Sequence, residues 1–235
     1  QTLVWREERS DRGVLVCQSG ADASIREIES AFSVRASVGY GGGDFTVAQG
    51  CAYFAAEGRL FRQPLNQNRA QPITPEDGGR CTSPAVSPDG HHLLYVHSHQ
   101  GNDVLMLVDT AGEGEPTTLV RGHDFFMQPC WNPRGDQVAW ICWDHPSMPW
   151  DSTALYLGEL KPGKPLPDLA SQKLVAGNTC GDIAVFQPAF SPDGRYLSYA
   201  SNENGWFNLH LQDLDSGEQK VLQGHSNHIT SVTAS

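Results

Sequence analysis

The sequence has no long hydrophobic run and little positive charge. Its 235 residues include 16 lysines and arginines against 27 aspartates and glutamates, which gives a net charge of −11. No apolar stretch approaches the roughly 18 residues of a membrane-spanning helix. An acidic chain also offers no basic face to nucleic-acid phosphates or to an anionic membrane. We therefore expect neither nucleic acid nor a membrane among the partners of this protein.

Closely spaced cysteine pairs are missing as well. None of the six cysteines has a second one at the two-residue spacing of zinc and redox motifs. Most lie in apolar strand patterns, as Cys142 does in the string AWICW, and this is typical of buried thiols in a reducing compartment. No basic leader precedes an apolar core at the N-terminus. We expect a cytoplasmic protein, and export stays open because the chain does not begin with Met.

Helical periodicity is the third absence. No window of 11 or more residues keeps its apolar residues at a 3.6-residue period, so we expect almost no helix, with residues 23–31 as a short exception. The 24 glycines and 15 prolines suit many short strands joined by tight turns. The composition predicts an all-β protein.

One phrase occurs three times in the chain. It consists of a proline, an apolar residue two places on, a Ser/Asn-Pro-x-Gly turn and an apolar strand. The copies are PAVSPDGHHLLY at 84–95, PCWNPRGDQVAW at 129–140 and PAFSPDGRYLSY at 188–199. Their turn prolines lie 45 and 59 residues apart. A four-stranded propeller blade takes about 40–50 residues, so the repeat predicts a β-propeller of four-stranded antiparallel blades.

The number of blades follows from the strand-like runs between the turns. Three such runs follow each turn, residues 45–74 form an earlier unit, residues 3–18 form a hairpin, and residues 224–235 begin another unit. We expect about four to five blades plus partial ones, in one domain spanning 1–235. Propellers close with about four to eight blades, so this is either a small ring or a segment of a larger one. Unpaired blade edges would cause self-association.

Four segments resemble a known family, in the same order along the chain. The chain resembles the acylaminoacyl-peptidase and dipeptidyl-aminopeptidase-like branch of the prolyl oligopeptidase family in the segments YGGGDF at 40–45, DFF at 124–126, WDHPSMPWD at 143–151 and NGWFNL at 204–209. The third string is very specific, whereas Ser-Pro-Asp-Gly turns also occur in TolB-like propellers. The chain departs from the pattern at Gly39, where family members usually have an acidic residue.

The resemblance implies a fold and a function. Family members have an N-terminal propeller of about seven blades that covers a C-terminal α/β-hydrolase domain with a Ser-Asp-His triad. This chain then corresponds to part of the TolB-like propeller, with the hydrolase domain absent. Its expected role is non-catalytic: it gates and positions peptide substrates. The implied partners are its own hydrolase domain and the peptide.

No catalytic or metal-binding motif is complete in the sequence. The nearest match to the Gly-x-Ser-x-Gly nucleophile elbow is GHSNH at 224–228, but Ser226 is followed by His228 where glycine is required. We interpret it as a turn between blades. His97 and His99 would share one strand face, yet no third ligand stands at a useful spacing. We expect no catalytic residue, no metal and no cofactor.

The functional prediction rests on the aromatic insertion WDHPSMPWD and on two upstream residues. These side chains would contact or admit the peptide, and the candidates are Arg35, Tyr40, Trp143, Asp144, His145, Trp150 and Asp151. A structural alternative is open for each part: the two tryptophans could pack between blades, and the YGGG segment could be a tight turn.

Two other functions are open. A stand-alone TolB-like or WD-repeat propeller would act as a protein-binding scaffold, and the string VLQGHSNH at 221–228 resembles the start of a WD-repeat blade. However, no blade ends in Trp-Asp at the required place. An enzyme with its active site on the propeller axis would need clustered carboxylates or histidines on the inner strands, and the inner runs contain none.

Overall fold

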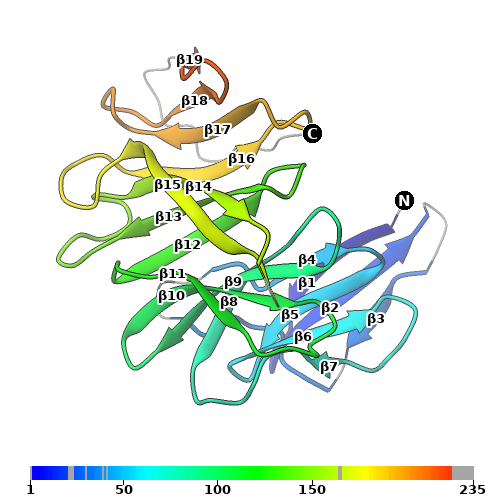
Figure 1. Cartoon of the computed structure of the whole chain (residues 1–235). Helices are drawn as coiled ribbons and strands as arrows, with labels where there is room; N and C mark the ends of the chain where they lie inside the picture. Colours follow the sequence, from blue (N-terminus) through cyan, green and yellow to red (C-terminus); the bar gives the residue numbers. More distant parts are fainter. Residues whose placement is uncertain are drawn as a thin grey trace.

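The computed structural model of the chain consists of antiparallel β-sheets (Figure 1). It describes residues 2–20, 24–29, 31–38, 40, 42–163 and 166–223. Within these ranges the chain forms one three-stranded sheet followed by four four-stranded sheets, and it contains no helix. Accordingly, no helix of the described part is long and apolar enough to cross a membrane.

The strands pair with their neighbours in sequence. The first sheet contains β1 (Thr2–Glu8), β2 (Gly13–Ser19) and β3 (Arg26–Glu29), and the second contains β4 (Phe45–Ala48), β5 (Cys51–Ala56), β6 (Arg59–Pro64) and β7 (Gln71–Pro72). The third contains β8 (Arg80–Val86), β9 (His92–His99), β10 (Asn102–Asp109) and β11 (Thr117–Val120). The fourth contains β12 (Phe125–Trp131), β13 (Gln137–Trp143), β14 (Ala154–Lys161) and β15 (Asp168–Gly177). The fifth contains β16 (Val185–Phe190), β17 (Tyr196–Ser201), β18 (Asn208–Asp213) and β19 (Gln219–Gln223).

The five sheets follow one another in chain order along an arc, with β1–β3 at one end and β16–β19 at the other (Figure 1). The first strands of the four-stranded sheets, β4, β8, β12 and β16, contact one another in succession. This is the arrangement of propeller blades around an axis. The predicted all-β architecture of four-stranded blades is confirmed, with four complete blades and a three-stranded unit before them. We number the blades in chain order and count the three-stranded unit as the first, so the complete blades are the second to the fifth.

The short helix expected within residues 23–31 is wrong. Arg26–Glu29 form β3, which pairs antiparallel with β2. The side chain of Ile28 is 1% exposed and packs in the core between the first and second sheets. An open strand edge and a buried apolar position outweigh weak local helix propensity here. Residues 21–23 and 30 lie outside the described ranges.

The core lies between adjacent sheets, so the central strands are buried on both faces. On β13 the even-numbered residues from 138 to 142 pack against the third sheet, and the odd-numbered residues from 139 to 143 pack against the fifth. A strand enclosed in this way is apolar at every position and does not alternate. This explains why the run VAWICW is continuously hydrophobic.

The repeated Ser-Pro-Asp-Gly turns join the first and second strands of a blade. In the turn at Ser87 the hydroxyl accepts a hydrogen bond from the His92 amide at 2.9 Å, and Gly90 adopts a φ of 78°. The turn at Ser191 has the same bonds, with Gly194 at 73°. Left-handed backbone explains the glycine in each copy. The turns are therefore fixed by local hydrogen bonds.

The first proline of each repeat marks a β-bulge on the innermost strand. The residue before it has positive φ in all three copies, at 54° for Ser83, 51° for Gln128 and 58° for Gln187, and the strand register shifts there. A bulge is one of the few places in a sheet that tolerates proline, which has no amide hydrogen to donate. The proline of each repeat therefore marks the position where the inner strand bends.

Candidate functional site

The predicted site residues gather on one face of the propeller. In an antiparallel blade that begins at its inner strand, the link between the second and third strands emerges on the same side as the link to the next blade. We call this side the connector face. It carries the described residues of the segment before β4 (31–38, 40 and 42–44), the segment between β11 and β12 (121–124) and the insertion between β13 and β14 (144–153).

A shallow pocket of about 260 Å³ opens on the connector face. Its walls come from the segment before β4, from the ends of β9, β10, β12 and β13, from the link between β9 and β10, and from the insertion. They contain the predicted residues Tyr40, Trp143 and His145, together with Val38, Ser98, Gly101, Asp103, Phe125, Met148 and Pro149. We call it the aromatic pocket.

Four rings pack together in its wall. The Phe125 and Trp143 rings stack with centroids 4.9 Å apart, and the Tyr40 ring meets both edge-on at 5.5 and 4.8 Å. The His145 ring packs edge-on against Phe125 at 4.8 Å. Such offset and edge-to-face contacts are favourable beyond the area they bury. They make the wall rigid, apolar and rich in π faces.

The Tyr40 hydroxyl ties distant blades together. It donates to the carboxylate of Asp103 on β10 and lies 2.7 Å from the Phe126 carbonyl oxygen on β12. Asp103 is buried, with 4% exposure. Burial and the adjacent Asp103 charge raise the pKa of Tyr40, which therefore remains a neutral donor. The segment before β4 is thus anchored to the third and fourth blades.

Two aspartates hold the insertion in place. The Asp144 carboxylate lies 2.9 Å from His123 Nδ1 and accepts the Asp124 amide at 2.9 Å, while Asp124 accepts the His145 amide at 2.8 Å. Burial opposes ionisation of Asp144, but the hydrogen bonds from His123 and the Asp124 amide outweigh it and lower the pKa of Asp144. Asp144 therefore positions the loop and does not face the pocket.

The outer half of the insertion has a different character. Asp151 accepts the Met148 amide at 3.1 Å and returns a bond from its own amide to the Met148 carbonyl at 2.9 Å, which closes a compact turn. Trp150 is 66% exposed and Met148 is 45% exposed. The packing alternative is thus confirmed for Trp143, which is 1% exposed between the fourth and fifth sheets, and is wrong for Trp150.

Arg35 does not line the aromatic pocket. Its guanidinium lies 3.5 Å from Glu8 at the end of β1, and its amide donates to Ala55 on β5. Asp103 does not stand out in the sequence, because the QGND string at 100–103 resembles an ordinary hairpin turn. The carboxylate meets Tyr40 only because the fold brings together residues 63 positions apart.

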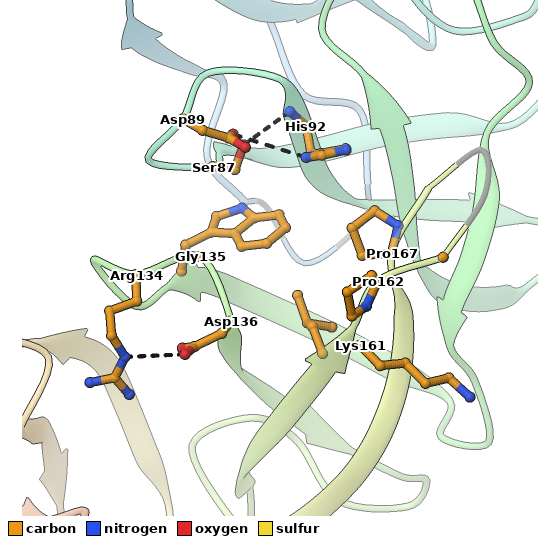
Figure 2. A pocket seen from close by; sticks show the side chains of 12 residues that line it. Ser87, Asp89, His92, Arg134, Gly135, Asp136, Lys161, Pro162 and Pro167 are labelled. Carbon is orange, nitrogen blue, oxygen red and sulfur yellow. Dashed lines mark hydrogen bonds and ion pairs between the residues drawn. The ribbon is translucent and has the colours of Figure 1, made fainter.

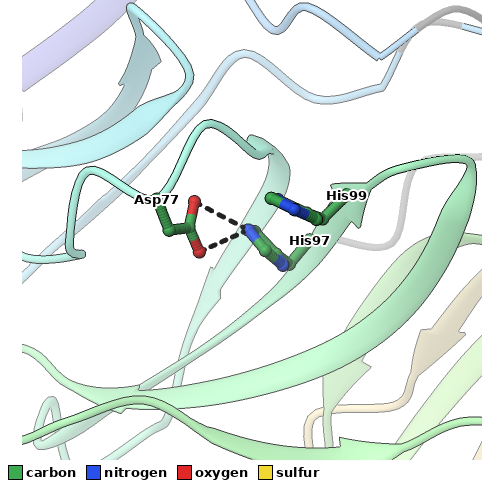
Figure 3. Close-up of side chains that lie close together, drawn as sticks. All are labelled: Asp77, His97 and His99. Carbon is green, nitrogen blue, oxygen red and sulfur yellow. Dashed lines mark hydrogen bonds and ion pairs between the residues drawn. The ribbon is translucent and has the colours of Figure 1, made fainter.

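The two histidines on β9 have a third neighbour. Asp77, in the segment between β7 and β8, places its carboxylate 3.1 Å from His97 Nε2, with His99 alongside (Figure 3). The fold thus brings a third side chain of ligand type, from 20 residues upstream, beside the histidine pair, which the sequence spacing does not show. The GHSNH string with Ser226, and Gly39, lie outside the described residues.

The opposite face has a hollow of its own. It measures about 360 Å³ and lies where the proline turns of the third and fourth blades meet the segment after β14 (Figure 2). The Trp131 indole there donates to the Ala85 carbonyl at 2.9 Å, and Arg134 pairs with Asp136 at 3.1 Å. These two polar groups thus bond to the protein itself, and none of the predicted site residues lines this hollow.

Comparison with known proteins agrees with this architecture. A family model described as the lipoprotein LpqB beta-propeller domain matches residues 58–159. The structure of a puromycin-hydrolyzing peptidase from Mycobacterium tuberculosis superposes with a TM-score of 0.82 and 22% identity over 95% of this chain. A puromycin hydrolase structure gives 0.82 with 25% identity over 95%. The TolB structure from Acinetobacter baumannii gives 0.65 with 16% identity over 93%. The fold is a β-propeller.

The relatives of this propeller are much longer proteins. The chain covers 37% and 38% of the two peptidases and 50% of the Acinetobacter TolB. A local match to TolB from Haemophilus influenzae is 49% identical over 45 residues, which is 18% of this chain and 10% of that protein. The neighbours thus include a peptidase, a puromycin hydrolase and TolB proteins, which all share the propeller fold expected from the sequence motifs.

Proposed function

We propose that this propeller is the substrate-gating part of a serine peptidase whose hydrolase domain is a separate unit of the same protein. The aromatic pocket on the connector face is the observation on which the proposal rests. It is assembled from three of the four segments that resemble the prolyl oligopeptidase family: the one that begins at Tyr40, the one that contains Phe125, and the one that begins at Trp143. The likeness to peptidases over 95% of the chain supports the same class.

The chemistry of the pocket indicates what it would hold. Its wall presents ring faces and edges, while the neighbouring Asp103 carboxylate is already engaged by Tyr40. Such a surface favours an aromatic or large apolar side chain of a peptide over a charged one. Met148 stands at the rim with 45% exposure, where a flexible thioether can adapt to side chains of different shapes.

Gating adds a selection by size to this contact. A propeller above a hydrolase excludes folded proteins and shields the reacting groups from bulk water. The propeller itself then supplies no nucleophile, and the 235-residue chain hydrolyses no peptide. Incubation of the purified chain with chromogenic aminoacyl and peptidyl amides tests this directly. Turnover that disappears in Ser226→Ala would refute the non-catalytic role.

The pocket is tested in the full-length peptidase. We expect Met148→Asp to raise KM for substrates with aromatic side chains by about tenfold, because a charge at the pocket rim replaces an apolar contact and would lose water when the substrate binds, while kcat stays unchanged. Trp206→Ala is the matched control, since this tryptophan is also exposed on the connector face but lies in the fifth blade. Equal KM values in Met148→Asp and the unsubstituted enzyme would refute the pocket assignment.

A scaffold function is the second candidate, favoured by the 49% identity to TolB over 45 residues. In that case the propeller binds a protein partner and works without any hydrolase. The coding sequence after Ser235 distinguishes the two functions. A nucleophile elbow within an α/β pattern selects the peptidase, and a stop after further blades selects the scaffold.

A further inference from the structure

Three potential metal ligands converge at the junction between the second and third blades. His97 and His99 lie two residues apart on β9, so their side chains leave the same face of the sheet. Asp77 approaches from the segment that connects β7 to β8 (Figure 3). One ligand atom from each residue lies within 4.8 Å of the other two. Within the described ranges no other group of three residues meets this condition.

The distances approach those of a coordination shell. Zinc binds imidazole nitrogen and carboxylate oxygen at about 2.0–2.2 Å, which places tetrahedral ligand atoms roughly 3.4 Å from one another. The Asp77 oxygens already lie 3.1 and 3.3 Å from His97 Nε2. The His99 ring is nearly parallel to the His97 ring, with centroids 6.1 Å apart. The three ligand atoms lie within 4.8 Å of one another, so a bound ion would have to draw them closer together.

A backbone contact orients one of these side chains, and a glycine leaves space for another. Asp77 accepts the Gly79 amide at 2.8 Å, which orients the carboxylate toward the histidines. A Cβ at Gly79 would lie 2.2 Å from His97 Nε2, so only glycine leaves room for the ring in this position. Ligands fixed by their surroundings lose less freedom when they bind an ion. The cluster is thus partly pre-organised.

The electrostatic surroundings admit a cation. The adjoining hollow of about 380 Å³ contains three carboxylates, on Glu57, Glu76 and Asp77, against two guanidiniums, on Arg59 and Arg80. Arg59 donates to the Thr74 carbonyl at 2.9 Å and lies 4.0 Å from the Glu76 carboxylate, while Arg80 donates to the Ser37 carbonyl at 2.8 Å, so none of these contacts involves Asp77. The local charge is therefore negative by one unit before a metal enters.

We propose that Asp77, His97 and His99 bind one divalent transition-metal ion, with zinc as the best match. Two imidazoles and one carboxylate suit zinc better than calcium or magnesium, which prefer all-oxygen shells. Three protein ligands leave a fourth position for water. The ion would clamp the segment between the second and third blades to β9. This site is separate from the aromatic pocket. The metal proposal can therefore fail while the proposed peptidase function holds, and the reverse is also possible.

Zinc titration by calorimetry on the metal-stripped 235-residue chain tests the site. We expect one saturable site, and at least about tenfold weaker binding in Asp77→Asn and in His99→Gln. His91→Gln is the matched control, because it removes an exposed histidine just before β9 and leaves the three ligands in place; its affinity should be unchanged. His99→Gln also separates a metal site from a plain Asp77–His97 ion pair, because it leaves that pair intact.

Cobalt(II) absorption gives a readout that needs no variant. A four- or five-coordinate cobalt ion on the unsubstituted chain should give a visible band that equimolar zinc abolishes. Zinc should also raise Tm, and excess chelator should reverse the rise. Absence of saturable zinc binding, absence of the cobalt band, or unchanged zinc affinity in His99→Gln would each overturn the proposal.

Discussion

Replacement of Tyr40 by phenylalanine tests how the connector face is held together. The substitution keeps the ring, and with it the edge-on contacts to Phe125 and Trp143. It removes the hydroxyl that donates to Asp103 and faces the Phe126 carbonyl. The Asp103 carboxylate, at 4% exposure, then loses its tyrosine donor without gaining access to water.

The expected cost follows from that lost bond. A buried polar group left without its partner costs about 1–3 kcal/mol, and we take about 2 kcal/mol for Tyr40→Phe. For a chain of this size 1 kcal/mol corresponds to roughly 2–4 °C, so Tm should fall by roughly 4–8 °C. Thermal unfolding followed by tryptophan fluorescence measures the shift. Tyr196→Phe is the control, since this partly exposed tyrosine lies on β17, away from Asp103.

A double substitution isolates the pairwise energy. In Tyr40→Phe/Asp103→Val both polar partners are gone, so no buried carboxylate remains unpaired. The double variant should therefore be more stable than the sum of the two single changes predicts, by about 1 kcal/mol or more. Additive effects, or a Tm for Tyr40→Phe within about 1 °C of the parent, would refute the idea that this hydroxyl joins the blades.

Three further outcomes follow from charged and apolar groups elsewhere. Because the pKa of Asp144 is lowered in the folded protein, its contribution to stability is present above about pH 4 and is lost as pH falls through its folded-state pKa. Acid titration should therefore show a smaller loss of stability in Asp144→Asn than in the parent, and an equal loss would contradict this. Burial lowers the pKa of His210 although the Glu203 charge acts in the opposite direction, so the free energy of unfolding should fall as pH drops below about 6.5. Chemical denaturation should show that this free energy depends less on pH in His210→Gln, and an unchanged pH dependence would contradict the prediction. Leu222 is 52% exposed on the last described strand, so light scattering should detect concentration-dependent association that Leu222→Glu reduces, whereas a clean monomer at all concentrations would argue against exposed blade edges.

The blade architecture could be predicted from the sequence because its signals are local. A Ser-Pro-Asp-Gly turn is closed by bonds within six residues, as between Ser87 and His92, so the pattern of residues and the structure coincide. The repeated proline also marks the bulge that bends each inner strand, although the residue pattern alone does not explain why a proline stands there. Local chemistry repeated at blade length is the kind of information that a single sequence contains.

The contacts that build the sites are not local. Tyr40 reaches Asp103 and Phe126 across 63 and 86 positions, and Asp77 reaches His97 across 20. No periodicity announces such pairs, and only the succession of blades brings them together. The insertion was identified because its tryptophans are conspicuous, yet Trp143 and Trp150 turned out to lie in opposite environments, one buried and one exposed.

The two faces of the propeller differ in how much their loops vary in length. The proline turns are short and are stabilised by their own side chains, so they leave little room for change. The links on the connector face differ widely: two residues, 100–101, join β9 to β10, whereas ten residues, 144–153, join β13 to β14. Loops on a rigid scaffold are where binding functions reside. The aromatic pocket and the Asp77 cluster both lie at such links, and this placement makes them the parts of the propeller most suited to define what the protein binds.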